Sequence, residues 1–219
     1  MEEELVKFQD NFDQVVHNCQ RFTPFVRGIE FQKEALLKLS KLIETVRANK
    51  TIVIKAKNEV GANTLLSLEH MAIAAKAEIE MIINIKEDNI DKAWENLIDA
   101  QSSLRTSMQA HPTGALHLEP YMNKLLAYEN LLFPNQIFMS IGLIAETGEC
   151  SICGSEYGSC EHLKGKAYMG EICCEIVNKI KELKEVSIVE EPASKRCRVY
   201  TIQTGEDVRD IMTWRIIEK

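Results

Sequence analysis

Cys150-Ser151-Ile152-Cys153-Gly154, followed closely by Cys160-Glu161-His162, divides this chain into two parts of different character. The spacing C-x2-C-x6-C-x-H places three thiols and one imidazole in a short segment. Thiolate sulfur and imidazole nitrogen are the ligands that Zn²⁺ prefers, and four of them complete its tetrahedral shell. We therefore expect Cys150, Cys153, Cys160 and His162 to bind one zinc ion.

The expected zinc site is structural, because four protein ligands leave no position for a water molecule or a substrate. The sequence also lacks H-E-x-x-H, and no H-x-E precedes the Cys pair as it does in zinc deaminases. No catalytic residue is predicted.

Cys173 is an alternative ligand. It opens the segment 171–184, which we predict to be a helix from the spacing of its apolar residues. In a treble-clef arrangement the first turn of such a helix supplies a ligand, so Cys173 would replace Cys160 or His162. The favoured interpretation is that one of Cys173 and Cys174 packs in the interior while the other is partly exposed.

The run from Cys150 to Cys173 reads C-x2-C-G-x5-C-x-H-x2-G-x2-Y-x-G-x2-C, and Glu185 to Ala193 reads E-V-S-I-V-x2-P-A. Residues 150–193 resemble the zinc-bearing segment of phage-derived proteins related to prohead maturation proteases. Those proteases carry a Ser-His catalytic design on strands upstream of this segment. Here the upstream region has helical patterning, so the resemblance implies a zinc scaffold kept without the active site.

Apolar residues recur at steps of three and four in the first two-thirds of the chain. The runs extend from Leu5 to Phe22, Leu36 to Val46, Leu65 to Ile82 and Ile90 to Leu104. This alternation places each set on one face of a helix. A fifth helix is expected to begin at Glu119-Pro120, because proline is favoured in a first helical turn.

The chain is therefore predicted to be mainly α, with an antiparallel helical bundle over residues 1–132 and a small α+β zinc-binding module over 133–219. Strands are expected at 136–144, 185–189 and 196–203.

The third helical run contains four closely spaced alanines. Tight core packing is the favoured explanation, and a seam for another helix is the alternative. These residues are Ala72, Ala74, Ala75 and Ala77.

A formal net charge of −7 disfavours non-specific binding to nucleic acid or to anionic membranes. The acidic start without a following apolar segment predicts no secretory leader, and no apolar run is long enough to span a bilayer. We expect a cytoplasmic protein whose remaining cysteines are reduced.

The expected function is that of a non-catalytic intracellular adaptor or complex subunit, which binds a protein partner or a second copy through its helical faces. One alternative is a phage- or mobile-element-related enzyme or enzyme accessory acting on protein or nucleic acid. That alternative requires an exposed polar cluster at the zinc module, formed by His117, Glu146, Cys174 and Arg198.

A second alternative is a nucleic-acid-binding zinc protein. Lys195, Arg196 and Arg198 form a short basic segment, and strand alternation would place the two arginines on one face. A solvated strand edge guarded by charge is the favoured explanation of this segment.

Overall fold

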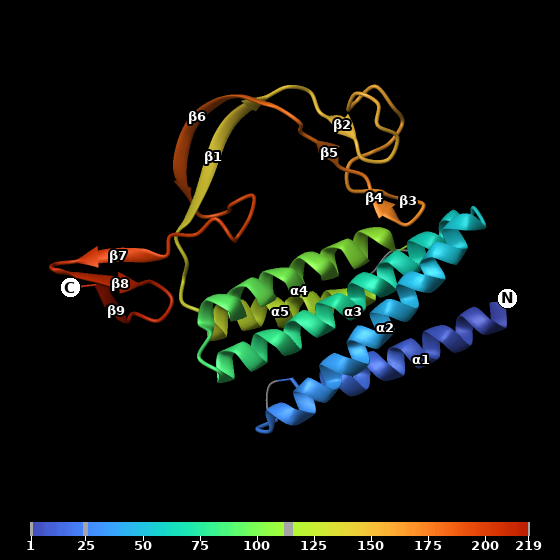
Figure 1. Ribbon diagram of the computed structural model, residues 1–219, viewed down its shortest axis with the longest axis horizontal. Helices are drawn as coiled ribbons and strands as arrows, with labels where there is room; N and C mark the ends of the chain where they lie inside the picture. Colours follow the sequence, from blue (N-terminus) through green and yellow to red (C-terminus); the bar gives the residue numbers. More distant parts are fainter. Residues whose placement is uncertain (1, 24–25, 112–115, 219) are drawn as a thin grey trace. The chain divides into compact units, whose positions relative to one another are not determined.

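The computed structural model describes residues 2–23, 26–111 and 116–218, and the described part is mainly helical with a small strand-containing C-terminal region (Figure 1). The predicted fold class is therefore confirmed. The chain forms two compact units. The helical unit comprises Met1–Leu125 and Ala167–Ile172, and the strand unit comprises Leu126–Lys166 and Cys173–Lys219.

Each predicted helical run lies in a helix, except that Phe22, the last residue of the first run, lies beyond the end of α1. The helices are α1 (Glu2–Gln20), α2 (Ile29–Lys55), α3 (Glu59–Lys86), α4 (Ile90–Ala110) and α5 (Glu119–Leu132), with a short 3₁₀ turn at Leu116–Leu118. The start of α3 is marked by Asn58, whose side-chain oxygen accepts a hydrogen bond from the Gly61 N–H at 3.0 Å. Such a cap satisfies one of the donors that a helix leaves free at its first turn.

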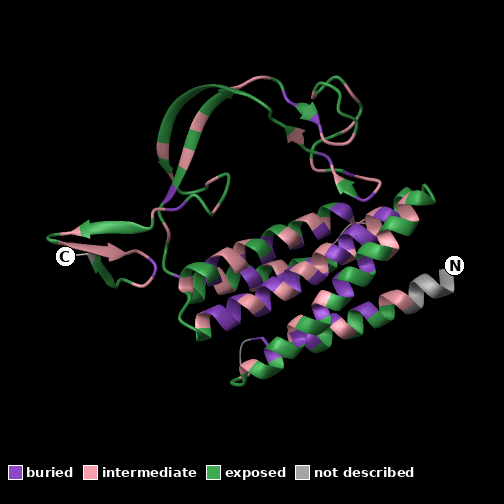
Figure 2. Cartoon of the chain, viewed as in Figure 1, coloured by how far each residue is buried: buried purple, intermediate pink, exposed green. Residues whose placement is uncertain are grey.

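The core of the helical unit lies where α3 packs along α2 and α4. One cluster joins apolar side chains of α1, α2 and α3, among them Phe12, Leu39 and Ile79. The four alanines of α3 are 0–4% exposed, which confirms tight core packing as their role (Figure 2).

A short hairpin from the region of the cysteines completes the helical unit. It consists of β3 (Ala167–Tyr168) and β4 (Glu171–Ile172). The Asn63 side chain on α3 donates a hydrogen bond to the Ala167 carbonyl at 3.3 Å and accepts one from the Gly170 N–H at 2.8 Å. Ala167 also packs with Leu66 of α3, so the hairpin joins the helices through polar and apolar contacts.

Gly170 is suited to this contact because it has a positive φ of 83°. A Cβ at this position would lie 3.3 Å from the side chains of Ile54 and Lys50. A larger residue would therefore be strained in its backbone and crowded against α2.

The strand unit is built mainly from paired strands. A long antiparallel pair joins β1 (Phe138–Ala145) to β6 (Ile180–Val189), and a short pair joins β2 (Glu149–Cys150) to β5 (Glu175–Ile176). A three-stranded sheet contains β7 (Thr201–Thr204), β8 (Asp207–Asp210) and β9 (Ile216–Glu218).

The helix predicted over 171–184 is wrong, because the segment forms β4, β5 and part of β6. Within this segment Ile180 and Leu183 are spaced by three residues, as on a helical face. In the structure, register shifts in β6 accommodate this spacing within a strand. Long-range pairing thus overrides the local pattern.

The strand predicted at 136–144 is confirmed by β1, and the one at 185–189 is the second half of β6. The strand predicted at 196–203 is only partly formed. Its end lies in β7, whereas its beginning bonds to the start of β1. There the Met139 N–H donates to the Cys197 carbonyl and the Val199 N–H to the Ile137 carbonyl, both at 2.8 Å.

Buried carboxylates in the helical unit are paired with cations from other helices. Glu69 contacts Arg47 and Lys50, each at 2.6 Å. Glu78 is fully buried on α3, and its carboxylate lies 2.7 Å from Nζ of Lys124 on α5. Pairing of this kind is required because an uncompensated buried charge is strongly destabilising.

Replacing Glu78 with Gln is expected to lower the free energy of unfolding of the helical unit by about 2 kcal/mol, because Lys124, whose side chain is 34% exposed, then loses a charge-assisted bond to a buried carboxylate. Glu80→Gln is the matched control. Glu80 is also on α3 and pairs with Lys76 at 2.9 Å, but its side chain is 31% exposed. We expect its loss to cost about 0.5 kcal/mol or less. Urea unfolding followed by far-UV circular dichroism measures both variants, and equal losses would contradict the assignment.

Candidate metal centre

The first two cysteines lie on a tight turn at the end of β2. The Gly154 N–H donates to the Cys150 carbonyl at 2.8 Å, and the Cys150 N–H donates to the Ser155 carbonyl at 2.8 Å. Gly154 has a φ of 72°, a conformation that glycine adopts without a steric penalty. The turn thereby brings the side chains of Cys150 and Cys153 to the same place.

The following loop returns the chain to this turn. The Tyr157 N–H donates to the Gly148 carbonyl at 2.8 Å, and the Ser159 N–H donates to the Glu156 carbonyl at 3.0 Å. Gly158, at φ 89°, permits the reversal that precedes Cys160. Local hydrogen bonds therefore position the second pair of predicted ligands.

The four predicted ligands converge. The sulfur atoms of Cys150, Cys153 and Cys160 and a ring nitrogen of His162 all lie within 4.8 Å of one another. Cys150 is buried, Cys160 and His162 are partly buried and Cys153 is exposed. Three thiols and an imidazole at this separation form a site suited to a metal ion and consistent with zinc.

The pKa values of the thiols are not equal. Burial opposes ionisation of Cys150, but hydrogen bonds from the backbone N–H groups of Cys153 and Ile152, and from neighbouring thiols, lower its pKa to about 7. Hydrogen bonds from the Ser155 hydroxyl and N–H lower the pKa of Cys153. For Cys160, a backbone hydrogen bond from His162 favours the thiolate, but burial and the adjacent thiols outweigh it and raise the pKa.

This inequality predicts a pH-dependent metal affinity. Cys160 holds its proton at neutral pH, and Cys150 gains one as the pH falls through about 7. For each thiol proton that the metal must displace, the apparent metal affinity falls about tenfold when the pH is lowered by one unit. We expect the zinc affinity to fall at least about 100-fold between pH 8 and pH 6, measured by competition with a chromophoric chelator of known protonation. An affinity independent of pH would contradict displacement of thiol protons.

Cys173 lies beside the cluster. It is fully buried, its N–H donates to the Lys166 carbonyl at 2.9 Å, and its sulfur is 3.8 Å from the sulfur of Cys150. Burial and the proximity of Cys150 raise its pKa to about 11. Cys174 is exposed, and its N–H donates to the Ser151 hydroxyl at 2.9 Å. One residue of the pair is thus interior and the other exposed, although neither lies on a helix.

The replacement of a ligand by Cys173 stays a prediction that metal analysis can test. Because Cys173 contacts Cys150 but is not in the group of four mutually close ligand atoms, we expect Cys173→Ser to retain one zinc per chain. Cys150→Ser is expected to lose it, and Cys174→Ser serves as the exposed control. Elemental analysis after exposure to a weak chelator measures the stoichiometry. Loss of zinc from Cys173→Ser, with retention in Cys160→Ser, would place Cys173 in the ligand set.

Ser151 and Ser155 are functional neighbours that the sequence analysis missed. Ser155 bonds to the thiol of Cys153, and Ser151 accepts the bond from Cys174 described above. The available signal was the placement of a hydroxyl residue one position after Cys150 and two positions after Cys153. Hydroxyl donors at such positions orient and stabilise thiolate ligands.

The alternative of a phage- or mobile-element-related enzyme requires an exposed polar cluster at the zinc module, and that cluster is not formed as predicted. Arg198 is only 2% exposed, lies 4.1 Å over the ring of Tyr200 and donates to Gln136 at 3.4 Å. The solvated basic edge predicted for this residue is therefore also wrong, because its side chain lies against Tyr200 and Gln136 while its backbone pairs with Phe138. Glu146 pairs with Lys179 at 3.0 Å.

His117 belongs to the helical unit, where its ring meets that of His111 edge-on at 5.0 Å between centroids.

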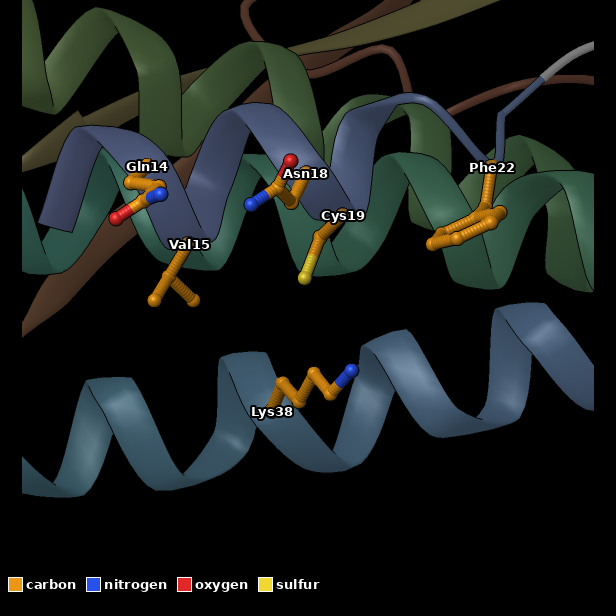
Figure 3. Close-up of a pocket in the computed structure, with 6 residues that line it drawn as sticks. All are labelled: Gln14, Val15, Asn18, Cys19, Phe22 and Lys38. Carbon is orange, nitrogen blue, oxygen red and sulfur yellow. The ribbon is translucent and has the colours of Figure 1, made fainter. Parts of the chain in front are cut away.

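A pocket of about 290 Å³ opens between α1 and α2, lined by Gln14, Val15, Asn18, Cys19, Phe22 and Lys38 (Figure 3). Its reactive groups already have partners. The Cys19 thiol donates to the Ala35 carbonyl at 3.7 Å, and Lys38 pairs with Glu34 at 2.7 Å. The pocket therefore shows no arrangement of nucleophile and base.

In the described part of the chain, no helix has the length and apolar character needed to cross a membrane. No family model, curated protein or solved structure matches this chain.

Proposed function

We propose that this chain is a non-catalytic adaptor or complex subunit whose strand unit is held together by a structural zinc ion. The observation that carries the proposal is the convergence of the three thiols and the imidazole within 4.8 Å. Zinc would be held by Cys150, Cys153, Cys160 and His162, and it would supply a cross-link between the two halves of the loop.

The donor set supports zinc. Soft thiolates together with an imidazole favour Zn²⁺ over hard cations, which take oxygen ligands. Bonds of about 2.3 Å to sulfur in a tetrahedron separate the ligand atoms by roughly 3.8 Å. The observed limit of 4.8 Å requires only a small inward movement of the side chains.

A structural role is supported by how little else the strand unit buries. Among its described residues, the buried apolar side chains are Phe133, Phe138, Cys150, Cys173 and Met212. A core of this size is too small to order a segment of this length. Metal binding supplies the missing free energy, on the order of 10–16 kcal/mol in small zinc-dependent folds.

The non-catalytic role is supported by the bonds of buried polar groups in the helical unit, which connect one helix to another. Glu69 and Glu78 are engaged by cations from neighbouring helices. The hydroxyls of Ser67 and Ser107 lie 3.1 Å apart and also donate to each other's backbone carbonyls. These groups join helices to each other, which suits a scaffold that presents surfaces to a partner.

The structural assignment predicts that metal and order are lost together. Cys153→Ser is expected to contain no zinc and to make residues 133–166 and 173–219 sensitive to limited proteolysis, while the helices and the hairpin bound to them persist. Cys197→Ser is the matched control, because Cys197 is exposed like Cys153 but lies outside the cluster. Elemental analysis, hydrogen exchange and proteolysis measured on the same samples report both properties.

If Cys153→Ser lost the metal but kept a protected strand unit, the structural role would be wrong and a catalytic role for the metal would become the better explanation. One zinc per chain in Cys197→Ser and none in Cys153→Ser, with matching loss of protection, is the result we expect.

A further inference from the structure

The long strand pair of the strand unit, β1 with β6, carries an apolar surface that no other described segment of the strand unit covers. Cross-strand partners in an antiparallel pair project to the same face, and successive pairs alternate between faces. The register assigns four apolar pairs to one face. We name this face the apolar stripe, and it consists of Met139–Ile188, Ile141–Val186, Leu143–Leu183 and Ala145–Ile180.

Two irregularities in β6 keep the apolar stripe continuous. The register shifts between Gly142 and Leu143 and again between Ile144 and Ala145, so that Lys184 and Lys181 are the additional residues of the two bulges. Without these bulges, residues spaced by three would alternate between the two faces. The strand geometry therefore gathers side chains that a regular strand would separate.

The apolar stripe is exposed. Apart from Ala145, which is partly buried, its members are 38–78% exposed, and Figure 2 shows exposed residues along both strands. Together they expose about as much surface as four fully exposed residues. At roughly 100 Å² of apolar surface each, this amounts to roughly 400 Å², a patch of the size that marks interaction sites on soluble proteins.

We propose that the apolar stripe is a self-association surface on which a second copy of this chain packs through the same face. A two-stranded pair is marginally stable alone, and an apolar face packed against another sheet provides the missing layer. This surface would be one contact of the complex subunit proposed above. The inference rests on that proposal only in assuming that the chain is part of a complex.

The charges of the strand pair favour a second copy as the occupant. The chain as a whole carries −7, which opposes self-association in general. Around the apolar stripe, by contrast, the lysines are balanced within one copy: Lys184 pairs with Glu182 at 2.8 Å, and Lys181 lies 3.8 Å from Glu146. Glu182 and Glu185 lie on the opposite face, and the apolar stripe itself contributes no charge. Two copies that meet through the stripe therefore bring no excess of like charge together.

The available area fits a small dimer. An interface in which about two-thirds of the area is apolar would bury roughly 600 Å² per copy, or roughly 1,200 Å² in total. This value lies at the lower limit for specific, stable interfaces. We therefore expect a reversible dimer at micromolar concentrations.

The test compares two isoleucines of β1 that lie on opposite faces. Ile141 is in the apolar stripe and 58% exposed, whereas Ile144 pairs with Glu182 on the other face and is 44% exposed. Sedimentation velocity of the full chain between about 1 and 200 µM, a range set by the expected interface size, should show a monomer–dimer equilibrium. We expect Ile141→Lys to raise the dissociation constant roughly tenfold or more, and Ile144→Lys to change it by less than about threefold.

Zinc content and circular dichroism of the same samples separate this proposal from that of the metal site. If Ile141→Lys lost zinc or order, Ile188→Lys at the most exposed position of the stripe replaces it. Hydroxyl-radical oxidation of Met139 adds a direct readout, since the dimer should protect this side chain.

A wild-type chain that stays monomeric throughout overturns the proposal. Protection of Met139 in that monomer would show that the same chain covers the stripe. A reactive Met139 would leave the stripe to a different protein. A dimer that Ile141→Lys and Ile188→Lys leave intact would place the interface elsewhere and overturn the proposal equally.

Discussion

In our proposal, the strand unit depends on the convergence of three thiols and one imidazole. Ionised thiols at this distance repel each other. Cys150, the more acidic thiol, accordingly contributes to the raised pKa of Cys160. A divalent cation converts the repulsion into attraction, and in our proposal it does so in a unit that buries few apolar side chains. The helical unit needs no such device, because its long helices bury a continuous core.

The fold class and the convergence of the four candidate ligands were predictable because both depend on local signals. Helical runs show a period of three to four residues along each helix, and the four ligands lie within one short loop closed by its own hydrogen bonds. The hairpin at Ala167–Ile172 was not predictable in this way. Its main partner, Asn63, is 104 residues away from Ala167 in the chain, and no local pattern encodes that contact.

The wrong helix at 171–184 has a specific physical cause. Ile180 and Leu183 have the spacing of a helix face, and a strand places residues at that spacing on one face only with a bulge. Whether bulges form depends on the pairing strand, β1, which lies more than 30 residues earlier in the chain. The same dependence on distant residues applies to Arg198, whose buried side chain donates to Gln136, 62 residues earlier, and whose backbone pairs with Phe138.

The metal cluster and the apolar stripe are connected through strand register. The two strands of the long pair continue into the short pair at the cluster, and the Glu146 N–H bonds to the Lys179 carbonyl at 3.0 Å between them. Cys150 faces Glu175 in the short pair, so a ligand is fixed within the ladder itself. A slip of one residue would move the apolar side chains to the other face. The backbone bonds of Met139 and Val199 to their partners oppose such a slip at one end of the ladder, and the bond from Glu146 to Lys179 together with the pairing of Cys150 with Glu175 opposes it at the other. A metal ion bound by the four candidate ligands would hold Cys150 within its own loop, so the ladder bonds and the bulges of β6 are what determine which side chains the exposed face carries.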